Sequence, residues 1–487
     1  MIYGFSNFGF EGSLVNVEAD IRDNAPAMDI VGLADSCIAG TKEMVKMAIK
    51  NAGFTFPEKK VLISLSPADV KKTGDEFDLP IALAVLENLK DDNRGRKVLV
   101  MGLLDLNGDI HPVKGTFAAC QTALEQGINK AILPENCPVP QGMDVIYVKN
   151  LKEAEQALPQ TDDIQFNDFS DSLNSIHEGN DIQINNLKFA MTVAIAGKHN
   201  LLTIGSIGGK AKELLARLPE IMPKLNHEEN QTVARIRSIA GLDSPKNNMN
   251  RPFRMPHQSC LIEGMLGGGM NCRPGEISLA HDGVLFLDEA SEFRTSVLQM
   301  LRVPMNKACI TLSRAGRSTV YPADFQLIMR VNSCPCGNYR YKNRICLCSQ
   351  KTIEQYWKKF PAPLLDRVEI RWCETSNDIL SYAPMTVNEM RKRISKAWRM
   401  QKNRGEFNGK IGFVSNYVLT DEVLDWFACE EDFRTLQKMT NLKKAFQIIM
   451  LARTLADMYG NDLISHDFID LAMKLRADTP LDEISNE

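Results

Sequence analysis

The sequence predicts an α/β protein built around a parallel sheet and followed by a helical C-terminal part. Three short apolar segments, residues 200–204, 283–287 and 325–332, carry this prediction. Continuous apolar runs of this length are typical of parallel strands that are buried on both faces. Because open α/β sheets bind ligands at the carboxyl ends of their strands, we expect the functional site just after these segments.

The first segment runs into a glycine-rich loop of the kind that binds phosphate. The loop contains Gly205, Gly208 and Gly209, then Lys210 and the start of a helical run. In such loops the backbone N–H groups and the helix N-terminus face the phosphates, while the lysine reaches the β and γ oxygens. The loop departs from G-x-x-x-x-G-K-[ST], because three residues rather than four separate Gly205 from Gly209 and Ala211 replaces the hydroxyl residue that binds Mg²⁺.

An acid pair follows the second segment and is typical of the Walker B motif. Asp288 is expected to hold Mg²⁺ on the phosphates of a nucleotide, and Glu289 to polarise the attacking water. Asn332 ends the third segment and is suited to position that water. Arg367, further along the chain, is a candidate arginine finger for the nucleotide of a neighbouring subunit. ATP and Mg²⁺ are therefore the expected cofactors, with a solvated acidic turn as the alternative for the acid pair.

Several further motifs match one known family. They stand at residues 251–257, 267–269, 274–281, 310–315, 334–337 and 452–457. Together with Asp288 and Glu289 they resemble the magnesium-chelatase-like AAA+ ATPases of the YifB/ComM type, over residues 1–475. The resemblance implies a ribosomal-S5-like (Lon-type) N-terminal α+β domain over 1–160, a linker over 161–186, a P-loop AAA+ core over 187–380 and a C-terminal helical lid over 381–487.

The resemblance also implies an activity and a cellular place. Family members are cytoplasmic and assemble as hexameric rings, and the best-known type is a DNA helicase that promotes branch migration. We therefore expect ATP-driven remodelling of DNA by a homo-oligomer. Two alternatives stay open: a AAA+ scaffold with weak or no ATP turnover, and a chelatase-type motor that acts on a protein partner. Lys443 stands near the position of the lid's sensor arginine and is expected to reach a nucleotide's phosphates.

Two β-branched runs within residues 308–321 predict a hairpin that turns at Ala315 and Gly316. Arg314 and Arg317 place positive charge near its tip. In related ring ATPases a hairpin at this position faces the pore, so DNA phosphates are its expected target. From the residues alone, a solvated turn explains the pattern equally well.

Two Cys-x-Cys pairs, Cys334 with Cys336 and Cys346 with Cys348, are separated by nine residues. Four thiolates can close a tetrahedral Zn²⁺ site, so the cluster predicts a metal site. The pairs are spaced more tightly than the usual C-x₂₋₄-C, and four reduced cysteines in a loop are the alternative.

The N-terminal part raises the alternative of a serine–lysine peptidase, because Lon-type domains carry that dyad. Where such sequences have the nucleophilic serine, residues 74–80 contain none, and Lys114 comes a few positions early. We therefore expect no peptidase activity and a surface position for Lys114.

Composition agrees with a cytoplasmic protein of several domains. The chain has 487 residues, of which 44% are hydrophobic and 24% charged, as in ordinary globular proteins. The sequence shows no apolar run long enough to span a membrane and no signal-peptide pattern, so its twelve cysteines are expected to be reduced or metal-bound. The net charge of −4 predicts that any contact with DNA is local.

Overall fold

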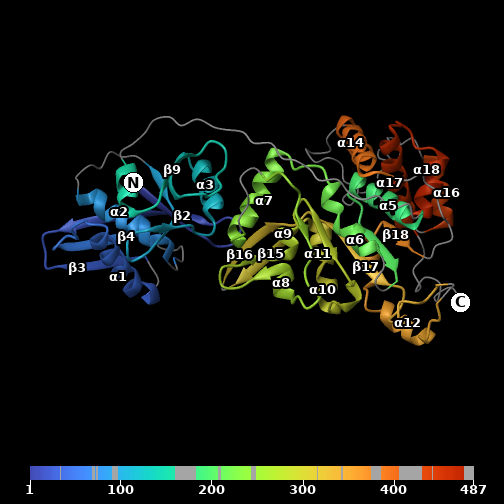
Figure 1. The fold of residues 1–487 in the computed structure, drawn as a ribbon, viewed down its shortest axis with the longest axis horizontal. Coiled ribbons are helices and arrows are strands. Elements are labelled where there is room, and N and C mark those ends of the chain that lie inside the picture. Colours follow the sequence, from blue (N-terminus) through green and yellow to red (C-terminus); the bar gives the residue numbers. More distant parts are fainter. Residues whose placement is uncertain are drawn as a thin grey trace.

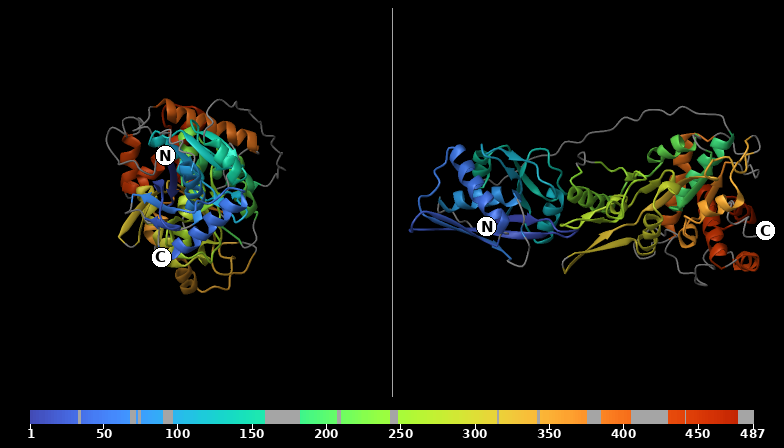
Figure 2. Two further views of the ribbon diagram at one scale, coloured as in Figure 1. Left: turned by 90° about the vertical axis from the view of Figure 1, so that its left-hand side faces the viewer. Right: turned by 90° about the horizontal axis from the view of Figure 1, so that it is seen from below.

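The computed structural model of the protein describes residues 1–32, 35–67, 72, 75–89, 97–158, 182–206, 210–242, 248–314, 316–341, 344–374, 385–404, 430–440 and 442–476. Most of the predicted linker lies outside these ranges. The molecule is elongated, with the N-terminal sheet at one end and the C-terminal helices at the other (Figures 1 and 2). Within the described residues, none of the helices combines the length and the apolarity needed to cross a membrane.

A seven-stranded mixed sheet forms the N-terminal part, in the order β3-β4-β2-β1-β5-β8-β9. Its strands are β1 (Ile2–Ser6), β2 (Ser13–Arg22), β3 (Ala27–Val31), β4 (Lys60–Ser66), β5 (Val98–Val100), β8 (Lys130–Pro134) and β9 (Asp144–Val148). The short strands β6 (Leu103–Leu104) and β7 (Ile110–His111) form a separate pair. The helices are α1 (Asp35–Asn51), α2 (Asp78–Leu89), α3 (Thr116–Glu125) and α4 (Leu151–Ala157). Helix α2 is buried from Asp78 to Leu86, because its apolar side chains fill the core between sheet and helices.

A five-stranded parallel sheet forms the central part, in the order β11-β14-β17-β10-β18. Its strands are β10 (Leu201–Gly205), β11 (Phe253–Arg254), β14 (Val284–Leu287), β17 (Gln326–Asn332) and β18 (Ile370–Cys373). Every residue of β10 and β14 is buried, as expected for apolar strands covered on both faces. The predicted α/β class and the three predicted strands are therefore confirmed.

Short helices and a hairpin surround this sheet. The helices are α5 (Ile182–Gly197), α6 (Ala211–Ala216), α7 (His227–Ala240), α8 (Ile262–Leu266), α9 (Glu276–Leu279), α10 (Thr295–Met300), α11 (Arg302–Lys307), α12 (Gln350–Trp357) and α13 (Ala362–Leu365). Strands β15 (Cys309–Arg314) and β16 (Arg317–Pro322) pair antiparallel, which confirms the predicted hairpin. A second small pair joins β12 (Gly267–Gly268) and β13 (Arg273–Pro274).

Helices make up the described C-terminal part, as the sequence predicts. They are α14 (Val387–Asn403), α16 (Glu430–Met439), α17 (Leu442–Tyr459) and α18 (His466–Lys474). They share one apolar core with α5 and with the sheet, which joins this part to the central one (Figure 1). Inside the core, Asp457 is paired with both Arg453 and Arg404, so its buried charge is compensated.

Helix α7 joins the N-terminal and central parts. The buried guanidinium of Arg235 donates hydrogen bonds to the carbonyl oxygens of Phe10 (2.9 Å) and Glu11 (2.8 Å) and to the hydroxyl of Thr122 (3.1 Å). Lys114 is exposed as expected, and its methylene groups lie over Gly241, whose φ of 74° ends α7. Glycine suits position 241 because its φ lies in the left-handed region that other residues seldom adopt.

Candidate nucleotide site

Three parallel strands end at one edge of the central sheet. In the register of β10 with β17, Gly205 lies opposite Asn332, and in the register of β14 with β17, Leu287 lies opposite Met329. Asp288 follows Leu287 directly, so the start of the glycine-rich loop, the acid pair and the asparagine share this edge. The strands end at Gly205, Leu287 and Asn332, and a polar residue or the glycine-rich loop follows or occupies each of these ends.

The described part of the phosphate loop consists of Gly205, Ser206 and Lys210. Gly208 and Gly209 lie outside the described residues. Lys210 is exposed and immediately precedes α6, and its ammonium group forms no ion pair within the described part of the chain. A free cation at a helix N-terminus is the combination that attracts phosphate.

Asp288 is held by two basic side chains. Arg330 Nε lies 2.5 Å from Asp288 Oδ1, and Lys212 Nζ lies 2.8 Å from Oδ2. Burial alone would raise the pKa of this carboxyl group, but its hydrogen bonds to Arg330 and Lys212 outweigh burial and hold the pKa below its usual range. Asp288 is therefore ionised, and both of its oxygens already have cationic partners.

Glu289 lies beside this cluster but is more exposed. Its backbone has a φ of 51°, in the left-handed region that non-glycine residues seldom adopt, so the chain turns sharply after β14. Its side chain is 43% exposed, and its Oε1 lies 3.4 Å from Arg330 Nη2. Glu289 is thus only loosely attached to the buried arginine and is accessible to solvent.

Asn332 has an unused hydrogen-bond acceptor. Its side-chain oxygen is buried and has no hydrogen-bond partner within the described parts of the protein. Since buried polar atoms normally find partners, this oxygen has the capacity to accept a hydrogen bond from a ligand or a water molecule. The role of Asn332 in positioning water stays a prediction.

A carboxylate fixes the beginning of the phosphate loop. Glu374, which follows β18, accepts hydrogen bonds through Oε2 from the backbone N–H (2.8 Å) and the hydroxyl (3.2 Å) of Ser206. The hydroxyl of Tyr341 donates to the same oxygen. A Cβ atom at Gly205 would lie 3.1 Å from Glu374 Oε2, so glycine is what allows this close approach. The loop therefore starts from an anchored position.

Arg367 and Lys443 lie at the opposite edge of the sheet. Asn200, which precedes β10, donates its side-chain N–H to the carbonyl oxygen of Arg367 (2.8 Å), whereas Ser206 at the other end of β10 contacts Glu374. The intervening strand separates these edges by about 20 Å. Lys443 Nζ lies 3.9 Å from Asp366 Oδ2, next to Arg367. Neither cation is therefore near the nucleotide edge of its own subunit.

A third cation completes this opposite edge. Arg302 lies near enough to Arg367 that its charge, after burial, lowers the pKa of the Arg367 guanidinium. Arg367 Nε also donates to Asn306 Oδ1 (2.7 Å), one turn along the helix that begins with Arg302. We refer to Arg302, Arg367 and Lys443 as the amino-edge cations.

The hairpin packs against the N-terminal part. The guanidinium carbon of Arg317 lies 3.7 Å from the ring centroid of Phe8, and the hydroxyl of Thr319 accepts a hydrogen bond from the N–H of Phe10 (2.9 Å). Arg314, opposite Arg317 in the hairpin, is exposed. Arg314 is thus available to an external anion, whereas Arg317 already has an aromatic partner.

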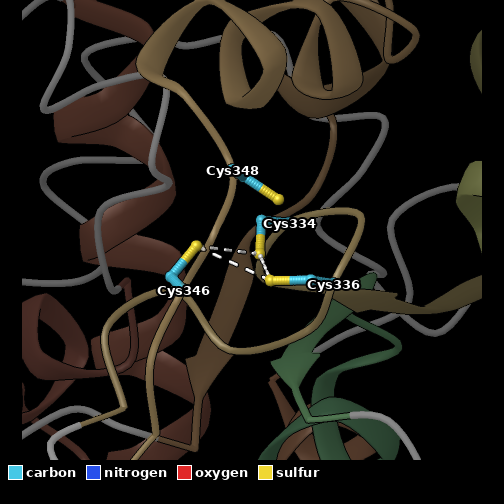
Figure 3. Close-up of side chains that lie close together, drawn as sticks. All are labelled: Cys334, Cys336, Cys346 and Cys348. Carbon is cyan, nitrogen blue, oxygen red and sulfur yellow. Dashed lines mark hydrogen bonds between the residues drawn. The ribbon is translucent and has the colours of Figure 1, made fainter.

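The four cysteines gather after β17. Cys334 Sγ lies 3.3 Å from Cys336 Sγ and 3.7 Å from Cys346 Sγ, and Cys336 lies 3.6 Å from Cys346 (Figure 3). With Cys348 included, all four sulfur atoms lie within 4.8 Å of one another. Thiols from two ends of one loop therefore face a common point.

Sequence reasoning missed Lys212, Arg330, Tyr341 and Glu374. A signal existed for Arg330, because a charge inside the apolar segment 325–332 must be paired when that strand is buried. For the other three residues, no pattern in the sequence indicated a partner. Lys212 lies within the first turn of α6, and Tyr341 and Glu374 meet only through the tertiary fold.

Comparison with known proteins adds three relatives and two family models. The model described as magnesium chelatase, subunit ChlI, matches residues 180–378, and that described as subunit ChlI of Mg-chelatase matches residues 17–137. YifB of Salmonella typhimurium is 32% identical, over 96% of this chain and 95% of its own length. The competence protein ComM of Haemophilus influenzae is 29% identical, over 98% and 97%. The DNA repair protein RadA of Escherichia coli is 30% identical, over 22% of this chain and 23% of its own.

Proposed function

Because the chain belongs to the magnesium-chelatase-like AAA+ family, with YifB and ComM as near-full-length relatives, we propose that it is a ring-forming factor that uses ATP to remodel DNA. The observation that carries the proposal is that four predicted site residues share one edge of the sheet. Lys210 follows the glycine-rich loop after β10, Asp288 and Glu289 follow β14, and Asn332 ends β17. AAA+ proteins are commonly oligomeric, and a hexameric ring is the assembly that we propose here.

ATP fits the residues at this edge. Lys210, which forms no ion pair with any described residue, suits phosphate, and the Asn332 oxygen, which has no hydrogen-bond partner among them, suits a water molecule. When bound, ATP would supply the phosphoanhydride bond whose hydrolysis drives the motor. Glu289, accessible to solvent, is the group that would accept a proton from the attacking water.

Mg²⁺ does not fit beside Asp288 in this arrangement. Both carboxylate oxygens are held by cations, and position 211 lacks the hydroxyl group that would be a second ligand. The buried Arg330 and the half-exposed Lys212 instead bring two positive charges to the place where phosphates would bind. We therefore assign charge neutralisation at this edge to protein side chains.

The amino-edge cations support the ring. They lie about 20 Å from the nucleotide edge of their own subunit, so they suit the nucleotide of a neighbour. Among them, Arg367 is the proposed finger, and Lys443 its companion from the lid helix α17. A ring brings the amino edge of one subunit to the carboxyl edge of the next.

The proposal of DNA as the substrate rests on family membership and on Arg314. The exposed arginine at the hairpin tip offers local positive charge on a chain whose net charge is −4. The names of two relatives, a competence protein and a DNA repair protein, support the same choice.

A catalytically impaired scaffold is the second candidate function. The hold of Arg330 and Lys212 on Asp288 favours it, because a metal-binding acid that is already neutralised loses its role in hydrolysis. In this case the ring assembles and binds its client without ATP turnover.

ATPase assays separate these functions. The full chain is assayed without DNA, with single-stranded DNA and with forked DNA. Stimulation by DNA is the expected result, and turnover that ignores DNA would redirect the proposal to a protein client. Absence of turnover in all three conditions supports the scaffold. In that event Arg330→Ala combined with Lys212→Ala and Ala211→Thr should give Mg²⁺-dependent hydrolysis, since these changes free both oxygens of Asp288 and add a ligand.

A further inference from the structure

The spacing of three of the four sulfur atoms fits a tetrahedral Zn²⁺ site, and the fourth, that of Cys348, lies within 4.8 Å of the others. Zn²⁺ binds thiolate sulfur at about 2.3 Å in a tetrahedron, which sets neighbouring sulfur atoms about 3.8 Å apart. The three measured separations, 3.3, 3.7 and 3.6 Å, are close to that value. A disulfide would need about 2.05 Å, and the thiolates of an iron–sulfur cluster are bound to several irons and are more widely spread.

In the second cysteine pair the thiols face inward, whereas the neighbouring apolar side chains are exposed to solvent. Along residues 345–348 the chain alternates, with Cys346 and Cys348 half-buried and facing the cluster (Figure 3). Ile345 and Leu347 are left 80% and 88% exposed. Burial of a large apolar side chain is worth about 1.5–3 kcal/mol, so hydrophobic packing alone would favour the reverse orientation. A metal ion at the cluster explains why the thiols are inside.

We propose that Cys334, Cys336, Cys346 and Cys348 bind one structural Zn²⁺, and that this ion holds Tyr341 against Glu374 to fix the start of the phosphate loop. The ion closes the loop between the two cysteine pairs, and Tyr341 lies within that loop. Closure places the Tyr341 hydroxyl on Glu374, which in turn accepts the Ser206 N–H at 2.8 Å.

The loop between the two cysteine pairs is also anchored at its Cys334 end. Cys334 follows Asn332 and Ser333, and the carbonyl oxygen of Ser333 accepts a hydrogen bond from the fully buried indole of Trp357 (3.0 Å). The ion is thus connected by short, packed segments to Asn332 on one side and to Ser206 on the other. The coupling to the phosphate loop rests on the proposed nucleotide site, whereas the metal site stands without it.

Metal content tests the site directly. The full chain, purified without chelators, should contain one zinc per chain by mass spectrometry of the metal. Replacing Cys346 and Cys348 by serine should lower the content at least tenfold. Cys309→Ser is the matched control, a half-buried cysteine outside the cluster, and should keep the full content. Wild-type protein that holds no zinc even after addition of Zn²⁺, or that holds iron instead, would overturn the proposal.

A second measurement covers the case in which the serine variant fails to fold. Wild-type protein is stripped of metal and titrated with Co²⁺, which should give the intense visible bands of tetrahedral thiolate coordination. Zn²⁺ should then displace these bands at a one-to-one ratio. Bands typical of octahedral oxygen ligation, or no bands at all, would contradict four-thiolate binding.

Hydrogen exchange tests the coupling without nucleotide. Tyr341→Phe should keep the zinc while the Ser206 amide exchanges at least tenfold faster, because Glu374 loses one of its anchors. Tyr339→Phe, in the same loop, is the control and should leave the exchange unchanged. Unchanged exchange in Tyr341→Phe would remove the coupling. Failure of zinc-loaded protein to bind ATP would instead defeat the proposed function and leave the metal site intact.

Discussion

The two cations beside Asp288 at the carboxyl edge of the central sheet are paired with that acid, whereas the amino-edge cations Arg302, Arg367 and Lys443 are half-buried or exposed. At the carboxyl edge Arg330 and Lys212 are both bound to Asp288. Among the described residues, Arg367 donates hydrogen bonds to the neutral groups of Asn306 and Pro363, and Lys443 is paired with Asp366 at 3.9 Å. In the proposed ring, this difference means that Asp288 is paired within its own subunit, while the amino-edge cations are left for a neighbour.

Among the predicted variants, Arg367→Ala should have the largest effect, and the quantity that it changes is the ATPase rate. In the proposed ring, Arg367→Ala removes the cation that stabilises charge on a neighbour's transition state, so kcat should fall about 10³-fold, or about 4 kcal/mol. The measurement is the DNA-stimulated ATPase rate at saturating ATP. Mixing this variant with Lys210→Ala subunits should restore part of the rate, because some interfaces then carry both intact groups. An unchanged rate in the unmixed variant would show that the amino edge has no role in hydrolysis.

Removing Asp288 should destabilise the fold by about 3 kcal/mol, because it leaves the Arg330 guanidinium buried with only Glu289 at 3.4 Å. Urea denaturation of Asp288→Ala measures the change. Glu289→Ala is the control, and its expected cost is below about 1 kcal/mol since its side chain is 43% exposed. Equal costs for the two variants would mean that Asp288 is not the main partner of the arginine.

The sequence predicts the fold better than it predicts these pairings. The mainly apolar segments 200–204, 283–287 and 325–332 identify the strands, because strands buried on both faces are rich in apolar residues. The contact of Arg330 with Asp288 depends on how β14 and β17 are aligned, with Leu287 opposite Met329. No local pattern encodes that register. The sequence therefore predicts that Arg330 needs a charged partner, but not that the partner is Asp288.

The same limit applies to residues that act across the sheet or between parts. Lys443 is expected at a nucleotide from its place in the lid, but its position at the amino edge follows from how α17 packs on the residues before β18. Arg317 is expected at the hairpin tip, and its contact with Phe8 depends on the docking of the N-terminal sheet. Helix and strand periodicity predict elements, whereas these contacts depend on tertiary packing.

His199, at the amino edge, should make the free energy of unfolding depend on pH. It precedes β10 at the amino edge, hydrogen-bonds Thr454 at 2.8 Å, and has its pKa lowered to about 3 by burial. The unfolded chain binds a proton near pH 6.5 and the folded chain does not, so stability is lost as pH falls below 6.5, by about 1.4 kcal/mol per unit. His199→Asn should remove about 2 kcal/mol of the loss between pH 6.5 and pH 5.

The prediction is checked by comparing how the free energy of unfolding changes with pH in wild type and in His199→Asn. Burial raises the pKa of Glu369 to about 7, which stabilises the fold as pH falls from 7 toward 4.5, opposite in sign to His199. Glu369 is present in both proteins, so its contribution cancels in the difference between them. Parallel slopes for wild type and His199→Asn would show that the imidazole is protonated in the folded state.

Lys443 should give the smallest effect on stability and the clearest contrast with Asp288. Its pair with Asp366 is about half exposed on both sides, and such pairs contribute about 0.2–1 kcal/mol. Lys443→Gln should therefore change the free energy of unfolding by at most about 0.5 kcal/mol in urea denaturation. In the proposed ring, Lys443→Gln should raise KM for ATP. The Lys443 side chain can leave its weak pair with Asp366 at little cost in stability and bind the phosphates of a neighbouring subunit's ATP. A stability loss like that of Asp288→Ala would instead mean that Lys443 is committed to its own subunit, and the two edges would then differ only in exposure.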